Sequence, residues 1–403
     1  MKLDAYNHIL PLPYFERLME ILPDPRLRER WPKLKTLYDV DAHLRLMDGF
    51  DDYAQVLSLG NPPIEMLGGP DETPALARLA NDGLADLCKR HPDRFPAFTA
   101  SLPMNNPDAA VAEAERAVTE LGARGVQVFT NVRGTPLSAP EFLPVFETLA
   151  GHDLPVWVHP IRGPNHPDYV TEDASENEIW FTFGWPYETS ACMARLIFSG
   201  LFDKLPDLKI ITHHMGGMIP FFSEKIRLGF DQLFDGDLEH NPVAERAGLK
   251  MQPIEYYRML YADTALNGSA SATRCGLDFF GGEHALFATD LQHDVVAFAA
   301  LHVASETGAV DDQRQPPLAG EQVRERHISH PQQLGHARPF ASPEQPLLDR
   351  DFRLGRQQRQ ASVVVAGGAQ TPGAIESVSQ IAFGPVQPRG VERDRRRHRH
   401  GTG

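Results

Sequence analysis

Short apolar runs rich in β-branched residues recur along the first 290 residues, and longer stretches with helical spacing separate them. Stretches such as 107–121 and 190–201 repeat apolar residues with the period of a helix. Strands that alternate with helices predict βαβ units and a parallel sheet. We predict these eight strands: Lys2–His8, Tyr53–Leu59, Phe95–Pro103, Gly125–Asn131, Pro155–Pro160, Lys209–His214, Leu260–Leu266 and Ala285–Asp290. Eight units favour a closed (β/α)8 TIM barrel, with a doubly wound open sheet as the alternative.

Four polar residues fall where such a sheet builds its site. His8, His159, His214 and Asp290 each end one of the predicted strands. The carboxyl ends of parallel strands meet on one face of a barrel, and barrel enzymes assemble their sites there. The sequence therefore predicts that these four side chains come together.

Imidazole nitrogens and carboxylate oxygens are good ligands for zinc and similar divalent ions. A catalytic metal site keeps one position open for water and lowers the pKa of that water towards neutrality. A nearby histidine or aspartate can then move protons to and from the reacting groups. We expect one divalent metal ion, with zinc as the first choice and manganese as the second.

The composition changes after Asp290. Residues 291–403 contain no Lys, Tyr, Trp, Met or Cys, and Arg and Gln are abundant. Within this stretch, only 295–310 has the spacing of an amphipathic helix. Such a helix could close the barrel, so we predict a barrel domain over 1–310. Residues 311–403 are predicted to be a disordered or non-native tail of low apolar content. A solvated tail and a shift of reading frame are both open explanations.

Charge and cysteine content narrow the class of protein. The net charge of -15 excludes a nonspecific nucleic-acid partner, because phosphate binding needs clustered Lys and Arg. The three cysteines form no CxxC pair, which fits a reducing compartment. The N-terminus lacks the apolar core of a signal peptide, and no apolar run of 18 residues predicts a membrane span. We therefore expect a cytoplasmic enzyme with a small-molecule substrate, and a homodimer is a further expectation.

Several stretches of the chain carry a resemblance to a known family. They include MKLDAYNHILP, AHLRLMD, VWVHP, the long run WPYETSACMARLIFSGLFDKLPDLKIITHHMGGMIPFF, LYADTAL and LFATD. Together they resemble the amidohydrolase-related decarboxylases that include aminocarboxymuconate semialdehyde decarboxylase and the γ-resorcylate and 5-carboxyvanillate decarboxylases. The resemblance covers essentially all of 1–290, and it implies the metal-dependent hydrolase type of barrel.

The resemblance also implies roles for individual residues. His8, His159 and Asp290 are similar to the family's metal ligands, and His214 to the proton-transferring His beside the metal-bound water. Arg45 stands where an arginine binds a substrate carboxylate, and Trp185 lies in a segment that lines the substrate. A structural role is the alternative for His214, an ordinary ion pair for Arg45 and packing for Trp185.

Two departures from the family pattern stand out. Tyr6 replaces the first His of the family's HxH metal motif, and a neutral phenol is a poor metal ligand. Residues 291–293 replace the aromatic-Pro stretch that usually follows the ligand on the eighth strand. His213 is a second histidine beside His214, and strand alternation predicts that it points the other way.

Three hypotheses for the function follow. The first is a non-oxidative decarboxylase of a small aromatic or unsaturated carboxylic acid, in which His214 and Asp290 manage the proton that replaces carbon dioxide. The second is a hydrolase of the same superfamily that opens an amide or lactone. The third is a degenerate, inactive barrel that has lost its metal through Tyr6 or its fold through the C-terminal tail.

Overall fold

The computed structural model describes residues 2–232 and 247–290, and within these residues the parallel strands form a closed ring. The barrel strands are β1 (Lys2–His8), β2 (Tyr53–Ser58), β3 (Ala97–Phe98), β4 (Ala100–Ser101), β5 (Val126–Phe129), β8 (Val156–His159), β9 (Ile210–Thr212), β10 (Tyr261–Asp263) and β11 (Ala285–Leu286). Parallel pairing joins β1, β2 and β3 in one sheet, and β4, β5, β8, β9, β10 and β11, in that order, in another.

Three hydrogen bonds close the ring. Thr99 lies between β3 and β4, and its N–H donates to Leu57 O at 2.9 Å, so the two short strands act as one. Ala5 N–H donates to Phe287 O at 2.8 Å, and Asp290 N–H donates to Tyr6 O at 3.1 Å. These last bonds join the first strand to the eighth. The predicted barrel is therefore confirmed, and the open doubly wound sheet is wrong.

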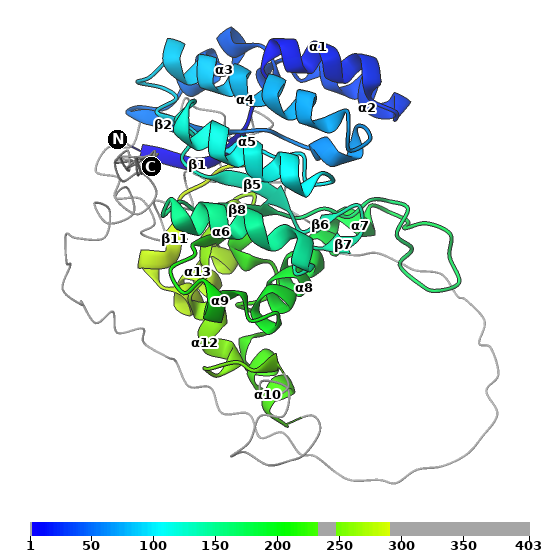
Figure 1. Cartoon of the computed structure of the whole chain (residues 1–403), viewed down its shortest axis with the longest axis vertical. Coiled ribbons are helices and arrows are strands. Elements are labelled where there is room, and N and C mark those ends of the chain that lie inside the picture. The colour runs from blue at the N-terminus through cyan, green and yellow to red at the C-terminus, as the bar shows by residue number, and fades with distance from the viewer. Residues whose placement is uncertain (1, 233–246, 291–403) are drawn as a thin grey trace, which may run out of the picture. The chain divides into compact units, whose positions relative to one another are not determined.

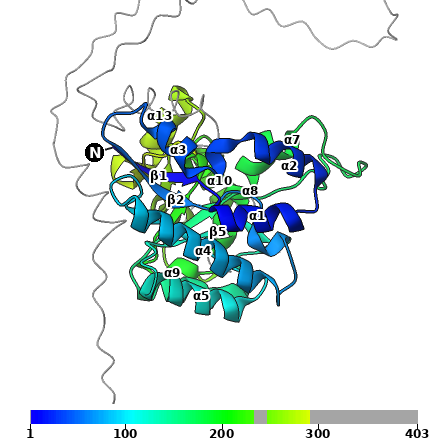
Figure 2. The ribbon, with the colours of Figure 1, turned by 90° about the horizontal axis from the view of Figure 1, so that it is seen from above.

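Helices lie outside the strands. They are α1 (Leu12–Ile21), α2 (Pro25–Arg30), α3 (Val40–Met47), α4 (Thr73–Arg90), α5 (Pro107–Thr119), α6 (Leu143–Gly151), α7 (Ile179–Thr182), α8 (Gly184–Phe198), α9 (Leu201–Lys204), α10 (Ser223–Gln232), α12 (Pro253–Arg258) and α13 (Ala270–Phe280). Short 3-10 helices occur at Trp31–Lys33, Lys35–Leu37, Ile64–Met66, Pro140–Phe142, His214–Gly216 and Gly282–His284. Helix α4 packs against α1 and α5, and α5 against α6 (Figure 1). Figure 2 shows α1, α4 and α5 outside β1, β2 and β5.

The alternation of side chains along each strand explains both the core and the site. In β8, Val156 and Val158 belong to the apolar layer beneath the helices, whereas Trp157 packs inside the barrel. Because side chains alternate along a strand, His159 points to the same side as Trp157. Gly125, with φ +152°, is required beneath that indole, because a Cβ there would lie 2.5 Å from Trp157 Cζ3.

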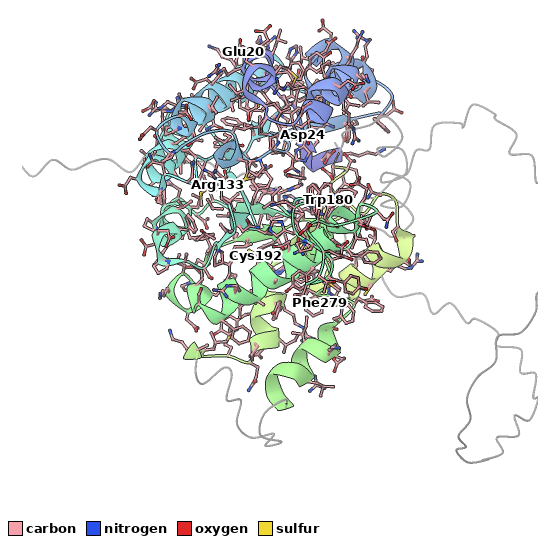
Figure 3. The ribbon with its side chains drawn as sticks, turned by 90° about the vertical axis from the view of Figure 1, so that its right-hand side faces the viewer. Glu20, Asp24, Arg133, Trp180, Cys192 and Phe279 are labelled. Carbon is pink, nitrogen blue, oxygen red and sulfur yellow. The ribbon has the colours of Figure 1, made fainter. Side chains whose placement is uncertain are left out.

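Exposure differs sharply between the outer helical surface and the interior. Glu20 of α1 is exposed at the edge of the molecule, whereas Cys192 of α8 lies buried within the ribbon (Figure 3). All three cysteines are free thiols, and of these only Cys192 is fully buried. Among the described residues, no helix combines the length and the apolar character needed to cross a bilayer. The predicted closing helix over 295–310 and the predicted tail over 311–403 lie outside the described residues.

Candidate metal centre and active site

Three donor side chains from three strands lie together at the carboxyl ends of the barrel strands. His8 ends β1, His159 ends β8 and Asp290 follows β11. Their donor atoms all lie within 4.8 Å of one another. His8 Nε2 is 2.9 Å from Asp290 Oδ1. The barrel thus brings together the three residues that the sequence singled out as metal ligands.

Hydrogen bonds fix which nitrogen of each histidine is free. Ser58 Oγ donates to Asn7 O at 2.5 Å, so it accepts from His8 Nδ1 at 3.0 Å. His159 Nδ1 donates to the carbonyl of Pro160 at 2.7 Å. Each ring therefore carries its proton on Nδ1, which leaves the Nε2 lone pair available.

Those free atoms are buried and lack hydrogen-bond partners. Nε2 of His8, Nε2 of His159 and Oδ1 of Asp290 make no hydrogen bond of acceptable geometry. Buried polar atoms are almost always satisfied. Three unsatisfied acceptors on adjoining side chains fit a bound cation, because a divalent ion accepts all three lone pairs at once.

The electrostatics of the cluster favour the same conclusion. Burial, with the neighbouring His213 and His8, holds the pKa of His159 well below its ordinary value, so its imidazole stays neutral. Burial by itself raises the pKa of Asp290. The hydrogen bond from His214 and the proximity of His8 outweigh burial, and the pKa of Asp290 falls well below its ordinary value. Neutral imidazoles and an ionised carboxylate are the forms that bind metals.

His214 reaches the other oxygen of Asp290. Its Nε2 is 3.4 Å from Asp290 Oδ2. Its backbone turns sharply after β9, with φ +54° at His214 and +53° at Met215, and its N–H donates to Asp263 Oδ1 at 2.9 Å. Positive φ is uncommon outside glycine and tends to occur at functional sites.

The charge state of His214 follows from its neighbours. Burial lowers its pKa, but the hydrogen bond and charge of Asp290, with the charge of Asp263, outweigh burial and raise the pKa above its ordinary value. Asp290 and Asp263 therefore stabilise the cationic form of His214 relative to an ordinary histidine.

The prediction for His213 was wrong. Its ring also faces the barrel interior, 3.6 Å from the ring centroid of Tyr6 and 5.4 Å from that of His159. Its Nδ1 is hydrogen-bonded to Asp263, and its Nε2 is buried without a partner. Strand alternation fails here because His213 is still extended, with φ -81° and ψ 160°, whereas the backbone turns to φ +54° at His214.

Tyr6 fills the centre of the barrel. Its hydroxyl donates to Gln127 Oε1 at 2.9 Å, and its ring meets His8 edge-on with centroids 4.7 Å apart. Burial, with the negative charges of Asp290 and Asp263, raises the phenol pKa well above its ordinary value. Tyr6 is therefore a neutral hydrogen-bond donor whose proton is directed to Gln127.

We expect Tyr6→Phe to lower the free energy of unfolding by about 1–3 kcal/mol, because Gln127 Oε1 loses its donor in a buried place. Metal content should not change. Denaturant unfolding and elemental analysis check both points. Tyr38→Phe is the matched control: its hydroxyl donates to Pro32 O in an exposed position, and its loss should cost under about 0.5 kcal/mol. Loss of metal from Tyr6→Phe would make the phenol a ligand.

The structure places the two predicted substrate residues differently. Trp185 lies beside the cluster, with its ring centroid 5.2 Å from that of His159 and 6.4 Å from that of His214. Its Nε1 donates to Arg162 O at 3.2 Å. Arg45 is an exposed residue of α3, and no contact joins it to the three donor residues in the part of the chain described.

Sequence reasoning missed three residues that hold the site. Asp263 binds both members of the histidine pair, Gln127 binds Tyr6 and Ser58 orients His8. A signal existed for Asp263, because it is an acidic residue in the predicted seventh strand, as Asp290 is in the eighth. No comparable signal existed for Gln127 or Ser58, since their roles depend on contacts between distant strands.

Comparison with known proteins decides the family. The amidohydrolase family model matches residues 39–326. This chain belongs to the amidohydrolase family. The resemblance found in the sequence is thereby confirmed, and the position of the site at the strand ends agrees with it.

Similar sequences in this amidohydrolase family include decarboxylases. The chain is 38% identical over 199 residues to γ-resorcylate decarboxylase of Polaromonas sp. (strain JS666), which covers 47% of this chain and 60% of that protein. It is also 30% identical over 309 residues to 6-methylsalicylic acid decarboxylase of Penicillium expansum. That match covers 73% of this chain and 87% of the Penicillium protein. The chain thus spans only about 60% of the length of the γ-resorcylate decarboxylases that it matches.

Solved structures give the same picture of the fold. The 2,6-dihydroxybenzoate decarboxylase from Rhizobium matches with a TM-score of 0.60 and 26% identity, covering 74% of this chain and 90% of that one. The dihydroxybenzoic acid decarboxylase from Polaromonas, which holds manganese and the inhibitor 2-nitroresorcinol, matches with a TM-score of 0.59 and 28% identity, covering 74% and 89%.

Proposed function

We propose that this amidohydrolase is a metal-dependent, non-oxidative decarboxylase of a small aromatic or unsaturated carboxylic acid. The observation that carries the proposal is the position of Asp290. Its Oδ1 faces His8, within the set of donor atoms, while its Oδ2 faces His214. A ligand set and a proton-carrying histidine are thus joined through one carboxylate, in a chain whose relatives are decarboxylases.

His8, His159 and Asp290 would hold one divalent metal ion. Two imidazole nitrogens and one carboxylate oxygen suit zinc, and manganese accepts the same donors. Zinc is our proposal, although a similar decarboxylase holds manganese. When bound, the ion supplies a Lewis acid that orients and polarises the oxygen atoms of the substrate.

His214 would supply the proton. In the reaction, the imidazolium N–H delivers its proton to the substrate carbon that bears the carboxylate. The bond between that carbon and the carboxylate then breaks, its electron pair returns to the unsaturated system, and carbon dioxide leaves. Asp290 stabilises the cationic form of His214 before the transfer, and solvent restores the proton afterwards.

Trp185 would cover the substrate. Its ring packs near both His159 and His214 and is flanked by Phe181, whose ring centroid is 4.6 Å away. A flat apolar wall of this kind stacks well on an unsaturated ring. The role of Arg45 as a carboxylate clamp rests on the resemblance alone and stays a prediction, as do the homodimer and the cytoplasmic location.

The test is carbon dioxide release from defined acids. Purified protein is stripped with a chelator, reloaded separately with zinc and manganese, and offered 2,6-dihydroxybenzoate, 6-methylsalicylate and 5-carboxyvanillate. We expect release from at least one acid with the loaded protein and none with the stripped protein. Loaded protein that releases no carbon dioxide but opens an amide or lactone would establish the hydrolase hypothesis instead. Protein that retains no metal would favour the degenerate barrel.

A further inference from the structure

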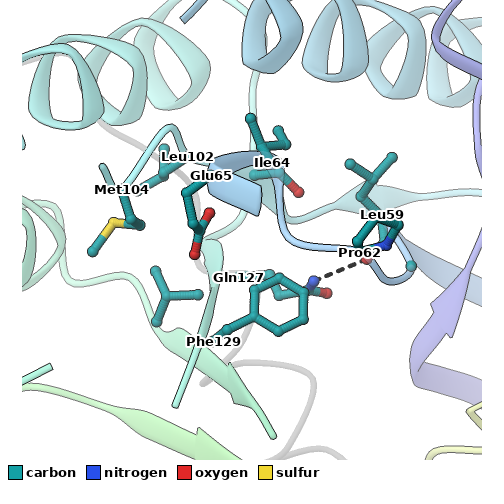
Figure 4. Close-up of a pocket in the computed structure, with 11 residues that line it drawn as sticks. Leu59, Pro62, Ile64, Glu65, Leu102, Met104, Gln127 and Phe129 are labelled. Atoms are coloured by element: carbon teal, nitrogen blue, oxygen red, sulfur yellow. Dashed lines mark hydrogen bonds between the residues drawn. The ribbon is translucent and has the colours of Figure 1, made fainter. Parts of the chain in front are cut away.

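A small cavity lies beside the metal centre, at the carboxyl ends of β2, β4 and β5. Its free volume is about 10 Å³, close to the room that one water-sized group needs. Its wall includes Leu59, Glu65, Ser101, Met104, Gln127 and Phe129. Figure 4 shows the side chains of Glu65, Met104, Gln127 and Phe129 gathered around this space. The wall of the cavity therefore combines apolar side chains with three polar ones, Glu65, Ser101 and Gln127.

Two of those polar groups each have an oxygen atom without a hydrogen-bond partner. Glu65 and Ser101 are 2% and 4% exposed, and Glu65 Oε1 and Ser101 Oγ make no hydrogen bond. A buried polar atom without a partner has lost its hydration without compensation, and such atoms are rare. A pocket that holds unsatisfied polar atoms suits a group that is small and polar.

The cavity adjoins the proposed reaction site. Gln127 accepts a hydrogen bond from the Tyr6 hydroxyl, and the Phe129 ring centroid is 5.2 Å from that of His159. Gly60, also in the wall, approaches His8 so closely that a Cβ there would lie 3.4 Å from His8 Cβ. A small ring held at the metal centre would therefore lie next to the cavity.

The protonation state of the Glu65 carboxyl suits a hydrogen-bond donor. Burial raises the pKa of its carboxyl to about 8, although its own backbone N–H and the charge of Arg133 act in the opposite direction. At neutral pH the carboxyl therefore keeps its proton. A protonated carboxyl can donate one hydrogen bond and accept another, as a hydroxyl group can.

We propose that this cavity is a substrate subsite in which Glu65 and Ser101 bind a hydroxyl substituent carried on the ring away from the reacting carboxylate. The inference rests on the proposed function, because it assumes an aromatic acid at the metal centre. Glu65 and Ser101 then decide which ring-hydroxylated acids are preferred. Tyr6 contributes by holding Gln127 in the wall of the subsite.

Binding of three probe acids tests the subsite without requiring turnover. Calorimetry with the metal-loaded protein compares benzoate, 3-hydroxybenzoate and 4-hydroxybenzoate. The wild type should bind at least one hydroxy acid about tenfold more tightly than benzoate, as expected for one additional buried hydrogen bond. In Glu65→Leu this preference should fall below about threefold, with the affinity for benzoate little changed.

Two further variants keep the test decisive if Glu65→Leu fails to fold. Glu65→Gln keeps a donor of the same shape and should keep part of the preference. Ser101→Ala should reduce it. Thermal midpoints confirm that each variant is folded.

A preference that survives both Glu65→Leu and Ser101→Ala overturns the inference, as does a wild type with no preference. A preference lost in the variants, in a protein that releases no carbon dioxide from any acid, leaves the subsite standing and overturns only the proposed reaction. A wild type that binds none of the three acids overturns both.

Discussion

His159→Ala should remove most of the bound metal. The wild-type ring donates its Nδ1 proton to Pro160 O and leaves Nε2 buried without a partner beside His8 and Asp290. Alanine removes one of three donors, and no other side chain in the described residues completes the set. Loss of a residue that hydrogen-bonds to a metal ligand commonly lowers metal affinity by about 10–100-fold. Loss of a direct ligand should therefore lower metal affinity by at least about 100-fold.

Elemental analysis after dialysis measures this loss, with the thermal midpoint as a second measurement. Binding to the folded state stabilises it in proportion to the logarithm of ligand concentration over Kd. Added zinc should therefore raise the midpoint of the stripped wild type and leave that of the variant unchanged. His152→Ala is the matched control, because this histidine pairs with Glu115 on the surface. A His159→Ala protein that retains one tightly bound ion would refute the ligand assignment.

His214→Asn should slow turnover by roughly 10²-fold or more while metal content stays at the wild-type level. Asparagine is close to histidine in polarity and can still contact Asp290, but it cannot carry a proton to the substrate. The effect should therefore fall on kcat. Single-turnover measurement with the acid that the wild type decarboxylates would separate the chemical step from binding.

The control for this variant is His284→Asn. That side chain hydrogen-bonds to Leu260 O and stacks on Tyr261. It precedes β11, at the opposite end of the strand from Asp290. The control should keep both metal and turnover. If His214→Asn loses its metal, His214 is a fourth ligand that compensates for Tyr6. If it keeps full turnover, the proton comes from another group.

The sequence predicted the barrel because its signals are local. Runs such as Pro155–Pro160 are short, apolar and β-branched, and the intervening stretches have helical spacing. Each run therefore predicts its own element without knowledge of its partners. Closure was harder to foresee, because it depends on the bonds from Ala5 to Phe287 and from Asp290 to Tyr6. These bonds connect residues at opposite ends of the barrel sequence.

What the sequence by itself determined is the set of donor residues. His8, His159 and Asp290 end parallel strands, and parallel strands that close into a ring bring those ends to one face. Only the tertiary structure decided which way the histidines next to these donors point. It turned both His213 and His214 towards the interior, because His213 continues the extended backbone and the chain then turns to positive φ at His214.

The tertiary structure also decided the partners of Tyr6 and Glu65. The Tyr6 hydroxyl finds Gln127 at a sequence separation of 121 residues, and the cavity containing Glu65 is assembled from three strands and a 3-10 helix. Hydrophobic periodicity fixes which face of a strand a side chain occupies, but not which distant atom it meets. Hydrogen-bond partners and unsatisfied buried groups are therefore properties of the packed barrel, and they decide the chemistry of the site.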